Sequence, residues 1–344
     1  MVVSDSRATA AGFLGGLVVL GLLVVVVGVD RVAGAVAGAS PVVAVAVVAV
    51  AVGWLLAWGL VLRSVLGALG IDISAVGAFL VFSAATFANN VTPFGQAGGE
   101  PLSALLIAEV ADSEYETGLA AIASVDAINL VPSIGLATLG LGFYAVTTTL
   151  GSRLEVVGAS IGLLAAALVV GAVLGWRYRD GVEATVARLV TPLVRTVARV
   201  WPGRRPPAPD AVAGRVAGFF ATIEHIAGDR RRLAAALAFS TLGWLGLTAA
   251  LWLSLLSLGH ATPFAAAMLA VPAGTVASVT PLPGGLGGVE AVQIGLLAAV
   301  TGVGAEALTA AVLVHRGATY WLPILVGGAA SSALGVSETV VEDA

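Results

Sequence analysis

The sequence contains no cysteine and no lysine, and it has few charged residues of either sign. Without cysteine, disulfides, thiolate catalysis and cysteine-ligated metals are excluded. Charged residues make up only 10% of the 344 residues and hydrophobic residues make up 59%, whereas soluble globular chains carry about 25% charged residues. The chain therefore does not have the composition of a protein that folds in water.

Long apolar runs are abundant instead, and a run of about 18 residues or more can cross a hydrocarbon core roughly 30 Å thick. The sequence predicts an all-α fold, a polytopic transmembrane bundle of about eight helices that includes re-entrant segments. The run at 117–150 is too long for one upright helix, and Pro132 is expected to kink it or divide it into two short spans. The expected helical stretches are Ala11 to Val29, Val42 to Leu62, Ser74 to Val91, Thr117 to Leu150, Leu154 to Trp176, Leu233 to Gly259, Pro263 to Val279, Ala291 to Val303 and Glu306 to Leu334.

Most of the arginines lie in one long polar connection. Eleven of the sixteen fall between Arg177 and Arg232, and the positive-inside rule places such a segment in the cytoplasm. Counting spans from it places both termini in the cytoplasm of a multi-pass protein of the cell membrane. The predicted units are an N-terminal transmembrane half (1–176), the cytoplasmic Arg-rich connection (177–232) and a C-terminal transmembrane half (233–344).

Within the connection, apolar residues between Val182 and Trp201 recur on one helical face and arginines lie on another. This pattern is typical of an amphipathic helix at a membrane surface, which either attracts anionic head groups or only sets the topology. The Pro-rich stretch from Pro202 to Asp210 is predicted to be a loop that separates the two halves.

The two halves share a motif. The stretch from Thr92 to Glu100 reads TPFGQAGGE, and the stretch from Thr280 to Glu290 reads TPLPGGLGGVE. Each has a Thr-Pro, a glycine-rich turn and a glutamate, and each lies between apolar runs, so we expect each to break a helix at membrane depth. In the predicted topology, the first break enters the membrane from the cytoplasmic face and the second enters it from the outer face. Paired breaks of this kind indicate an inverted repeat with a substrate site near the midplane.

Non-helical backbone at membrane depth must be buried in protein or must face a watery cavity, because an unsatisfied peptide group in hydrocarbon is costly. We expect glycines of the breaks to adopt left-handed backbone conformations and to leave amides free to bind an anion such as a phosphate. The candidates for this backbone, and for close approach of neighbouring chains, are Gly98, Gly99, Gly287 and Gly288, and Gly284 and Gly285 are further candidates for contacting the substrate. Glu100 and Glu290 follow the glycines at the start of a helix, where a carboxylate either serves the substrate, caps the helix or pairs with an arginine.

Two more charges lie in apolar surroundings at equal offsets. Asp126 follows Glu100 by 26 residues, and Arg316 follows Glu290 by 26 residues. Arg316 is expected to pair with Asp126 or with one of the glutamates, or to bind a substrate phosphate. Asn90, at the first break, is a candidate for bonding broken backbone or substrate. The histidines have no metal-ligand spacing, and no nucleotide-binding fingerprint is present, so neither a metal nor a cofactor is expected.

The motif from Asn89 through Glu100, the motif from Pro283 to Glu290, and the pair His315-Arg316 resemble the flippase-like family, the transmembrane region shared with lysylphosphatidylglycerol synthases. The resemblance implies a helix bundle with re-entrant segments that moves aminoacylated phospholipid or handles polyprenyl-linked lipids. The acidic, glycine and arginine positions of the family map onto Glu100, Gly98, Gly99, Gly284, Gly285, Gly287, Glu290 and Arg316.

The chain departs from the family pattern in two places. Many members carry Glu-Arg where this chain has Val125-Asp126. The sequence also ends at Ala344 without the soluble aminoacyltransferase domain of the full synthases, so it is not expected to charge lipids itself.

The leading hypothesis is a non-enzymatic flippase whose partner is a membrane lipid, either a phospholipid or a polyprenyl-phosphate-linked lipid, and no nucleic acid. One alternative is an intramembrane lipid-modifying enzyme that uses Glu100 and Glu290 as paired carboxylates. The other is a non-catalytic membrane assembly protein.

Overall fold

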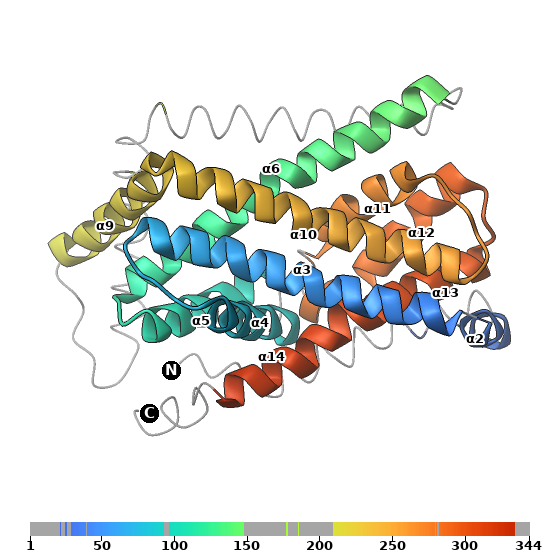
Figure 1. The fold of residues 1–344 in the computed structure, drawn as a ribbon, viewed down its shortest axis with the longest axis horizontal. Helices are drawn as coiled ribbons and strands as arrows, with labels where there is room; N and C mark the ends of the chain where they lie inside the picture. Colours follow the sequence, from blue (N-terminus) through green and yellow to red (C-terminus); the bar gives the residue numbers. More distant parts are fainter. Residues whose placement is uncertain are drawn as a thin grey trace.

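A computed structural model describes residues 29–38, 40–92, 96–147, 209–278 and 282–333, together with a few isolated positions. All the regular secondary structure in these ranges is helical, which confirms the predicted all-α fold (Figure 1). The predicted first span, the predicted span from Leu154 to Trp176 and the amphipathic stripe from Val182 to Trp201 lie outside these ranges, apart from isolated positions.

Two long helices, α3 (Pro41–Ala68) and α10 (Arg230–Ser257), pack against each other along their length. Helix α3 begins with a proline, which fits the first turn, and it is apolar around its whole circumference, as expected of a helix that contacts protein and lipid. The two helices are antiparallel. The Ser40 amide at the start of α3 donates to the Ser257 carbonyl at the end of α10 at 2.9 Å, and at the other end Gly67 lies against the Arg232 guanidinium. Figure 1 shows them side by side.

The N-terminal half continues with α4 (Ala75–Val91), α5 (Gln96–Val110) and α6 (Tyr115–Thr147). Ser74 caps α4 by accepting a bond from the Gly77 amide at 2.9 Å. Helix α6 returns along α5, and Gly118 permits this because a Cβ there would collide with the Ala104 carbonyl. The alternative of two short spans around Pro132 is wrong, because α6 is one helix of 33 residues that contains this proline.

The C-terminal half continues with α11 (Phe264–Ala277), the 3-10 turn η1 (Pro283–Gly285) and α12 (Gly288–Thr301). The stretch predicted as one helix over 306–334 is helical without a gap in the described residues. It consists of α13 (Ala305–Arg316), a π-helical turn η2 (Gly317–Trp321) and α14 (Leu322–Ala333). A π-turn inserts an extra residue into a helix, and such turns are frequent at functional sites.

The two halves repeat the same succession of helices. Within the described residues, each half has a helix of 28 residues, which is followed by two short helices of 17 and 15 or of 14 and 14 residues and then by a long helical segment. The equivalent first helices, α3 and α10, are antiparallel, which is the orientation that an inverted repeat requires.

Four of the described helical stretches are long and apolar enough to cross a membrane: Pro41–Ala68, Tyr115–Thr147, Arg230–Ser257 and Pro283–Thr301. Two more of the described helices are α2 (Val29–Ala37), which packs on α13, and α9 (Pro209–Gly228), which packs on α6. Helix α9 begins inside the stretch predicted as a loop, and α10 begins three residues before the predicted Leu233. Membrane localisation follows from these spans, and the cytoplasmic placement of the termini stays a prediction.

Candidate functional site

The second break has left-handed backbone at three glycines, of which Gly287 was predicted to adopt it. Gly284, Gly285 and Gly287 have φ angles of 53°, 67° and 83°, a left-handed region that only glycine enters without strain. The same prediction is wrong for Gly288, which is the first residue of α12 and is helical. The chain has already turned by Gly287, so no further left-handed residue is needed.

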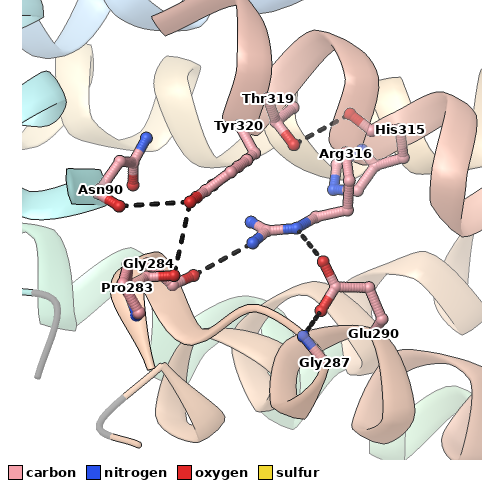
Figure 2. Close-up of polar contacts among 9 residues, drawn as sticks. All are labelled: Asn90, Pro283, Gly284, Gly287, Glu290, His315, Arg316, Thr319 and Tyr320. Carbon is pink, nitrogen blue, oxygen red and sulfur yellow. Dashed lines mark hydrogen bonds and ion pairs between the residues drawn. The ribbon is translucent and has the colours of Figure 1, made fainter. Parts of the chain in front are cut away.

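Glu290 holds this break together from within α12. Its side chain is almost fully buried, and the residue is 1% exposed. One carboxylate oxygen, Oε2, accepts a hydrogen bond from the Gly287 amide at 2.6 Å, and the other, Oε1, accepts from Arg316 Nε at 2.7 Å. Glu290 therefore caps α12 and also pairs with an arginine, as Figure 2 shows.

Arg316 joins the π-turn region to the break. Its Nη2 donates to the Gly284 carbonyl at 3.0 Å, and its guanidinium carbon lies 4.5 Å from the centre of the Tyr320 ring. The Tyr320 ring occupies the space that a side chain at Gly284 would take. The predicted pair between Asp126 and Arg316 does not form, because the carboxylate partner of Arg316 is Glu290.

Tyr320 connects the second break to the first. Its hydroxyl lies 3.2 Å from the carbonyl of Asn90, at the end of α4, and 3.4 Å from the carbonyl of Pro283 (Figure 2). Asn90 thus contributes to the site through its backbone, as well as through a side chain that lines the cavity described below. The sequence reasoning missed Tyr320, although its position four residues after Arg316 places both on one helical face.

The first break is built differently. Helix α5 begins at Gln96, so Gly98 and Gly99 are helical and the prediction of left-handed backbone there is wrong. Gly99 serves close packing instead, because a Cβ at this position would collide with Asn89 on α4. Of the residues that break the chain, 93–95 lie outside the described ranges.

Glu100 lies one turn into α5, and its carboxyl group contacts that of Asp126 on α6 at hydrogen-bonding range. The structure thus brings together the two residues of each half that are separated by 26 positions. In the N-terminal half both are acids, and in the C-terminal half they form an ion pair.

A cavity of about 150 Å³ lies where helices of the two halves meet. Asp126 from the N-terminal half and Arg316 from the C-terminal half both line it. Its aromatic wall comes from Trp54 and Trp58 on α3 and Phe82 on α4. Its polar lining includes Thr86, Asn89, Asn90, Asp126, Thr275, Ser278, Gln293, His315, Arg316 and Thr319.

Four side chains of this lining carry a buried polar atom with no hydrogen-bond partner in the described part of the chain: Trp54 Nε1, Asn89 Oδ1, Gln293 Oε1 and His315 Nδ1. Buried polar atoms are nearly always satisfied by protein or by something bound. Gln293 was not identified from the sequence as a site residue. The one sequence feature that could have identified it is its position three residues after Glu290.

An apolar groove adjoins the cavity. It has a volume of about 360 Å³, runs between α3 and α10, and is lined by Val50, Gly53, Trp54, Leu56, Ala57, Leu60, Phe239, Leu242 and Gly246. Exposed apolar side chains flank it, among them Val52 at 40% and Leu245 at 38% exposure. Trp54 belongs to both the groove and the cavity.

The fold and the site together define a polytopic helical membrane protein in which two interrupted helix pairs meet at one polar cavity. The comparisons with known proteins agree. A sequence model of the family described as Lysylphosphatidylglycerol synthase TM region matches residues 12–327. The chain therefore belongs to the family of the lysylphosphatidylglycerol synthase transmembrane region.

Two curated relatives are similar over most of their length. The chain is 25% identical over 281 residues to a UPF0104 membrane protein of Pyrococcus horikoshii, covering 80% of this chain and 81% of the relative. It is 27% identical over 282 residues to a UPF0104 membrane protein of Methanothermobacter thermautotrophicus, covering 80% of this chain and 77% of the relative. Both relatives are named as membrane proteins.

Proposed function

We propose that the protein is a flippase-like transporter, which moves a phospholipid or polyprenyl-linked lipid across the bilayer without modifying it. The lipid head group enters the polar cavity, and its apolar chain lies in the groove between α3 and α10. Membership of the family supports this assignment, as does the bipartite chemistry of the site.

The shared wall at Trp54 is the observation that carries the proposal. A polar cavity beside an apolar groove is complementary to a molecule that is polar at one end and apolar at the other. The indole of Trp54 has the same two-sided character, since its ring is apolar and its Nε1 is a donor. The Trp54 residue lies at the junction of cavity and groove, where the head group and the chain of one lipid would meet.

The lengths of the short helices support a re-entrant arrangement of both breaks. At 1.5 Å per residue, helices of 14 to 17 residues reach about 21 to 26 Å, less than the roughly 30 Å of a hydrocarbon core. The pair α4 with α5 would therefore dip into the membrane and return, and the repeated order of helices gives the same arrangement to α11 with α12, although η1 and α12 together (Pro283–Thr301) are long enough to cross. With the halves inverted, they enter from opposite faces, and a rocking of one half against the other would open the cavity to each side in turn.

The geometry gives little support to the enzyme alternative. Paired carboxylate catalysis needs an acid and a base that are free to exchange protons with substrate. Both oxygens of Glu290 are already engaged, one by Gly287 and one by Arg316. Glu100 and Glu290 also contact different partners in different halves of the molecule.

Filling the groove tests the proposal. Gly53 lines the groove, and a Cβ at this position meets no atom within 4 Å, so Gly53→Leu should fold normally and obstruct the lipid chain. The matched control is Gly142→Leu on α6, where a Cβ also meets nothing within 4 Å.

The measurement is transport of fluorescent phospholipid and of a fluorescent polyprenyl phosphate between the leaflets of proteoliposomes. We expect wild type and Gly142→Leu to move at least one of the two lipids and Gly53→Leu to be at least about tenfold slower, the effect of losing roughly 1.4 kcal/mol. If Gly53→Leu moved lipid as fast as wild type, the groove would not be the path of the lipid chain. If wild type moved lipid no faster than it moves in protein-free vesicles, the protein would not be a lipid transporter.

A further inference from the structure

The charged groups of the cavity are already partnered within the protein. Arg316 bonds the Glu290 carboxylate and the Gly284 carbonyl, and the Asp126 carboxyl group contacts Glu100. An anionic ligand that took Arg316 for itself would leave Glu290, which is 1% exposed, as an unpaired buried charge, and such charges are strongly destabilising. The ionic groups therefore shape the wall of the cavity and are poor candidates for the main contact to a ligand.

The groups without partners are uncharged and planar. Trp54 Nε1 is a donor, Gln293 Oε1 and Asn89 Oδ1 are acceptors, and a neutral imidazole nitrogen such as His315 Nδ1 is one or the other according to its tautomer. Three of these residues are more than nine-tenths buried, with exposures of 6% for Trp54, 2% for Gln293 and 3% for His315. A mixed set of neutral donors and acceptors matches hydroxyl groups, because each hydroxyl both donates and accepts.

The aromatic wall and the size of the cavity favour a ring. Trp54 and Trp58 pack edge to face at 5.5 Å between ring centres, and Trp58 and Phe82 do so at 6.0 Å. Ligand pockets commonly combine such an apolar aromatic wall with a few placed polar groups. A cavity of about 150 Å³ is the size that holds one benzene-sized ring, so it has room for a single ring bearing hydroxyl groups.

We infer that this cavity recognises one sugar residue in the head group of a glycolipid. The inference rests on the proposed function, since the chain of the same lipid would lie in the α3–α10 groove. The apolar face of the sugar packs on Trp54 and Trp58, and its hydroxyls bond to Gln293, Asn89 and the Trp54 Nε1. The sugar is bound intact, with no bond made or broken.

The test is binding of octyl-chain probes to the full chain in nanodiscs, which avoids detergents that themselves carry sugars. The probes are octyl glucoside, octyl mannoside, octyl phosphate and octylamine, and binding is followed by tryptophan fluorescence and by thermal stabilisation. Because the four probes share one chain, differences between them report on the head group. We expect at least one octyl glycoside to bind more tightly than octyl phosphate and octylamine.

Variants locate the site. Gln293→Leu should weaken glycoside binding by about tenfold, the effect of one buried hydrogen bond, and Trp54→Phe should weaken it by a similar factor because the ring remains while the donor is lost. Trp252→Phe is the matched control for the tryptophan change, since Trp252 donates to the Thr262 carbonyl at 2.9 Å and does not line the cavity. Its affinity for glycosides should equal that of wild type.

The outcomes separate this inference from the proposed function. Tighter binding of octyl phosphate or octylamine than of either glycoside would contradict recognition of a sugar and would leave the proposed lipid transport unaffected. Binding of none of the four probes, in a protein that still moves lipid, would mean that water alone fills the cavity and would also overturn it. Glycoside binding without movement of any lipid would support the sugar site and contradict transport.

Discussion

The two halves of the molecule place a pair of charged residues at the same spacing and use opposite chemistry in each. In the C-terminal half, Glu290 and Arg316 attract each other at 2.7 Å, and the remaining carboxylate oxygen caps a helix. In the N-terminal half, Glu100 and Asp126 bring two carboxyl groups together. Like carboxyl groups at close range cannot both carry their charge without a proton or a cation between them.

This difference shows that two halves with the same order of helices can have different structural roles. The C-terminal pair fixes η1, α12 and α13 into one unit, because every group in it has a partner. The N-terminal pair contains no opposite charge, so its contact depends on a proton or a cation shared between the two carboxyl groups. We interpret the C-terminal break as the rigid wall of the cavity and the N-terminal break as the wall that adjusts when the contents of the cavity change.

The largest effect should come from breaking the C-terminal pair. Arg316→Met leaves Glu290 buried and unpaired, which we expect to lower the free energy of unfolding by about 3 to 5 kcal/mol. Thermal unfolding in nanodiscs measures it. Arg231→Met is the control, because Arg231 is exposed at the start of α10, and its effect should stay within about 0.5 kcal/mol.

Adding Glu290→Gln to Arg316→Met tests the cause of this loss, because it removes the buried carboxylate charge that Arg316→Met leaves unpaired. The double variant should recover part of the lost stability. A double variant that is less stable than Arg316→Met alone would show that the capping of Gly287 by Glu290, and not the ion pair, holds the C-terminal break together.

The glycines of the two breaks provide the second test. Gly284→Ala places a methyl group against the Tyr320 ring at a φ of 53° and should cost about 1 to 3 kcal/mol. Gly288→Ala is the control within the same motif, since Gly288 is helical and its nearest neighbour to a Cβ is Thr280 Cγ2 at 3.2 Å. Thermal unfolding again measures both, and equal losses would mean that the left-handed turn does not carry the stability of the break.

The sequence predicted the second break better than the first for a physical reason. Glycine has two uses, left-handed backbone and close approach of two chains, and composition cannot tell them apart. Gly284, Gly285 and Gly287 serve the first use, whereas Gly99 serves the second by lying against Asn89. The predicted left-handed backbone is therefore found at Gly287 and not at Gly98, Gly99 or Gly288, which are helical.

Long apolar runs and the repeated motif were enough to predict the bundle and the repeated order of helices, because both depend on local pattern. The cavity was not predictable in the same way. Trp54 and Gln293 lie on helices that are far apart in the sequence, and only packing brings them to one cavity. The pairing of Arg316 had several candidate acids in the sequence, and the choice of Glu290 depends on the turn at Gly284 that carries the chain back toward it.

The smallest effect should come from the N-terminal pair, and it should have the opposite sign. Glu100→Gln removes the need for a proton or a cation between the two carboxyl groups and gives Asp126 an amide donor, so we expect the free energy of unfolding to rise by about 1 kcal/mol, the net contribution of one hydrogen bond. Glu109→Gln, an exposed position on the same helix, should leave stability unchanged. If Glu100→Gln instead destabilised the protein as strongly as Arg316→Met, the two acids would be a bound pair like their C-terminal counterparts. The N-terminal wall would then be as fixed as the C-terminal one, and the halves would differ in charge alone.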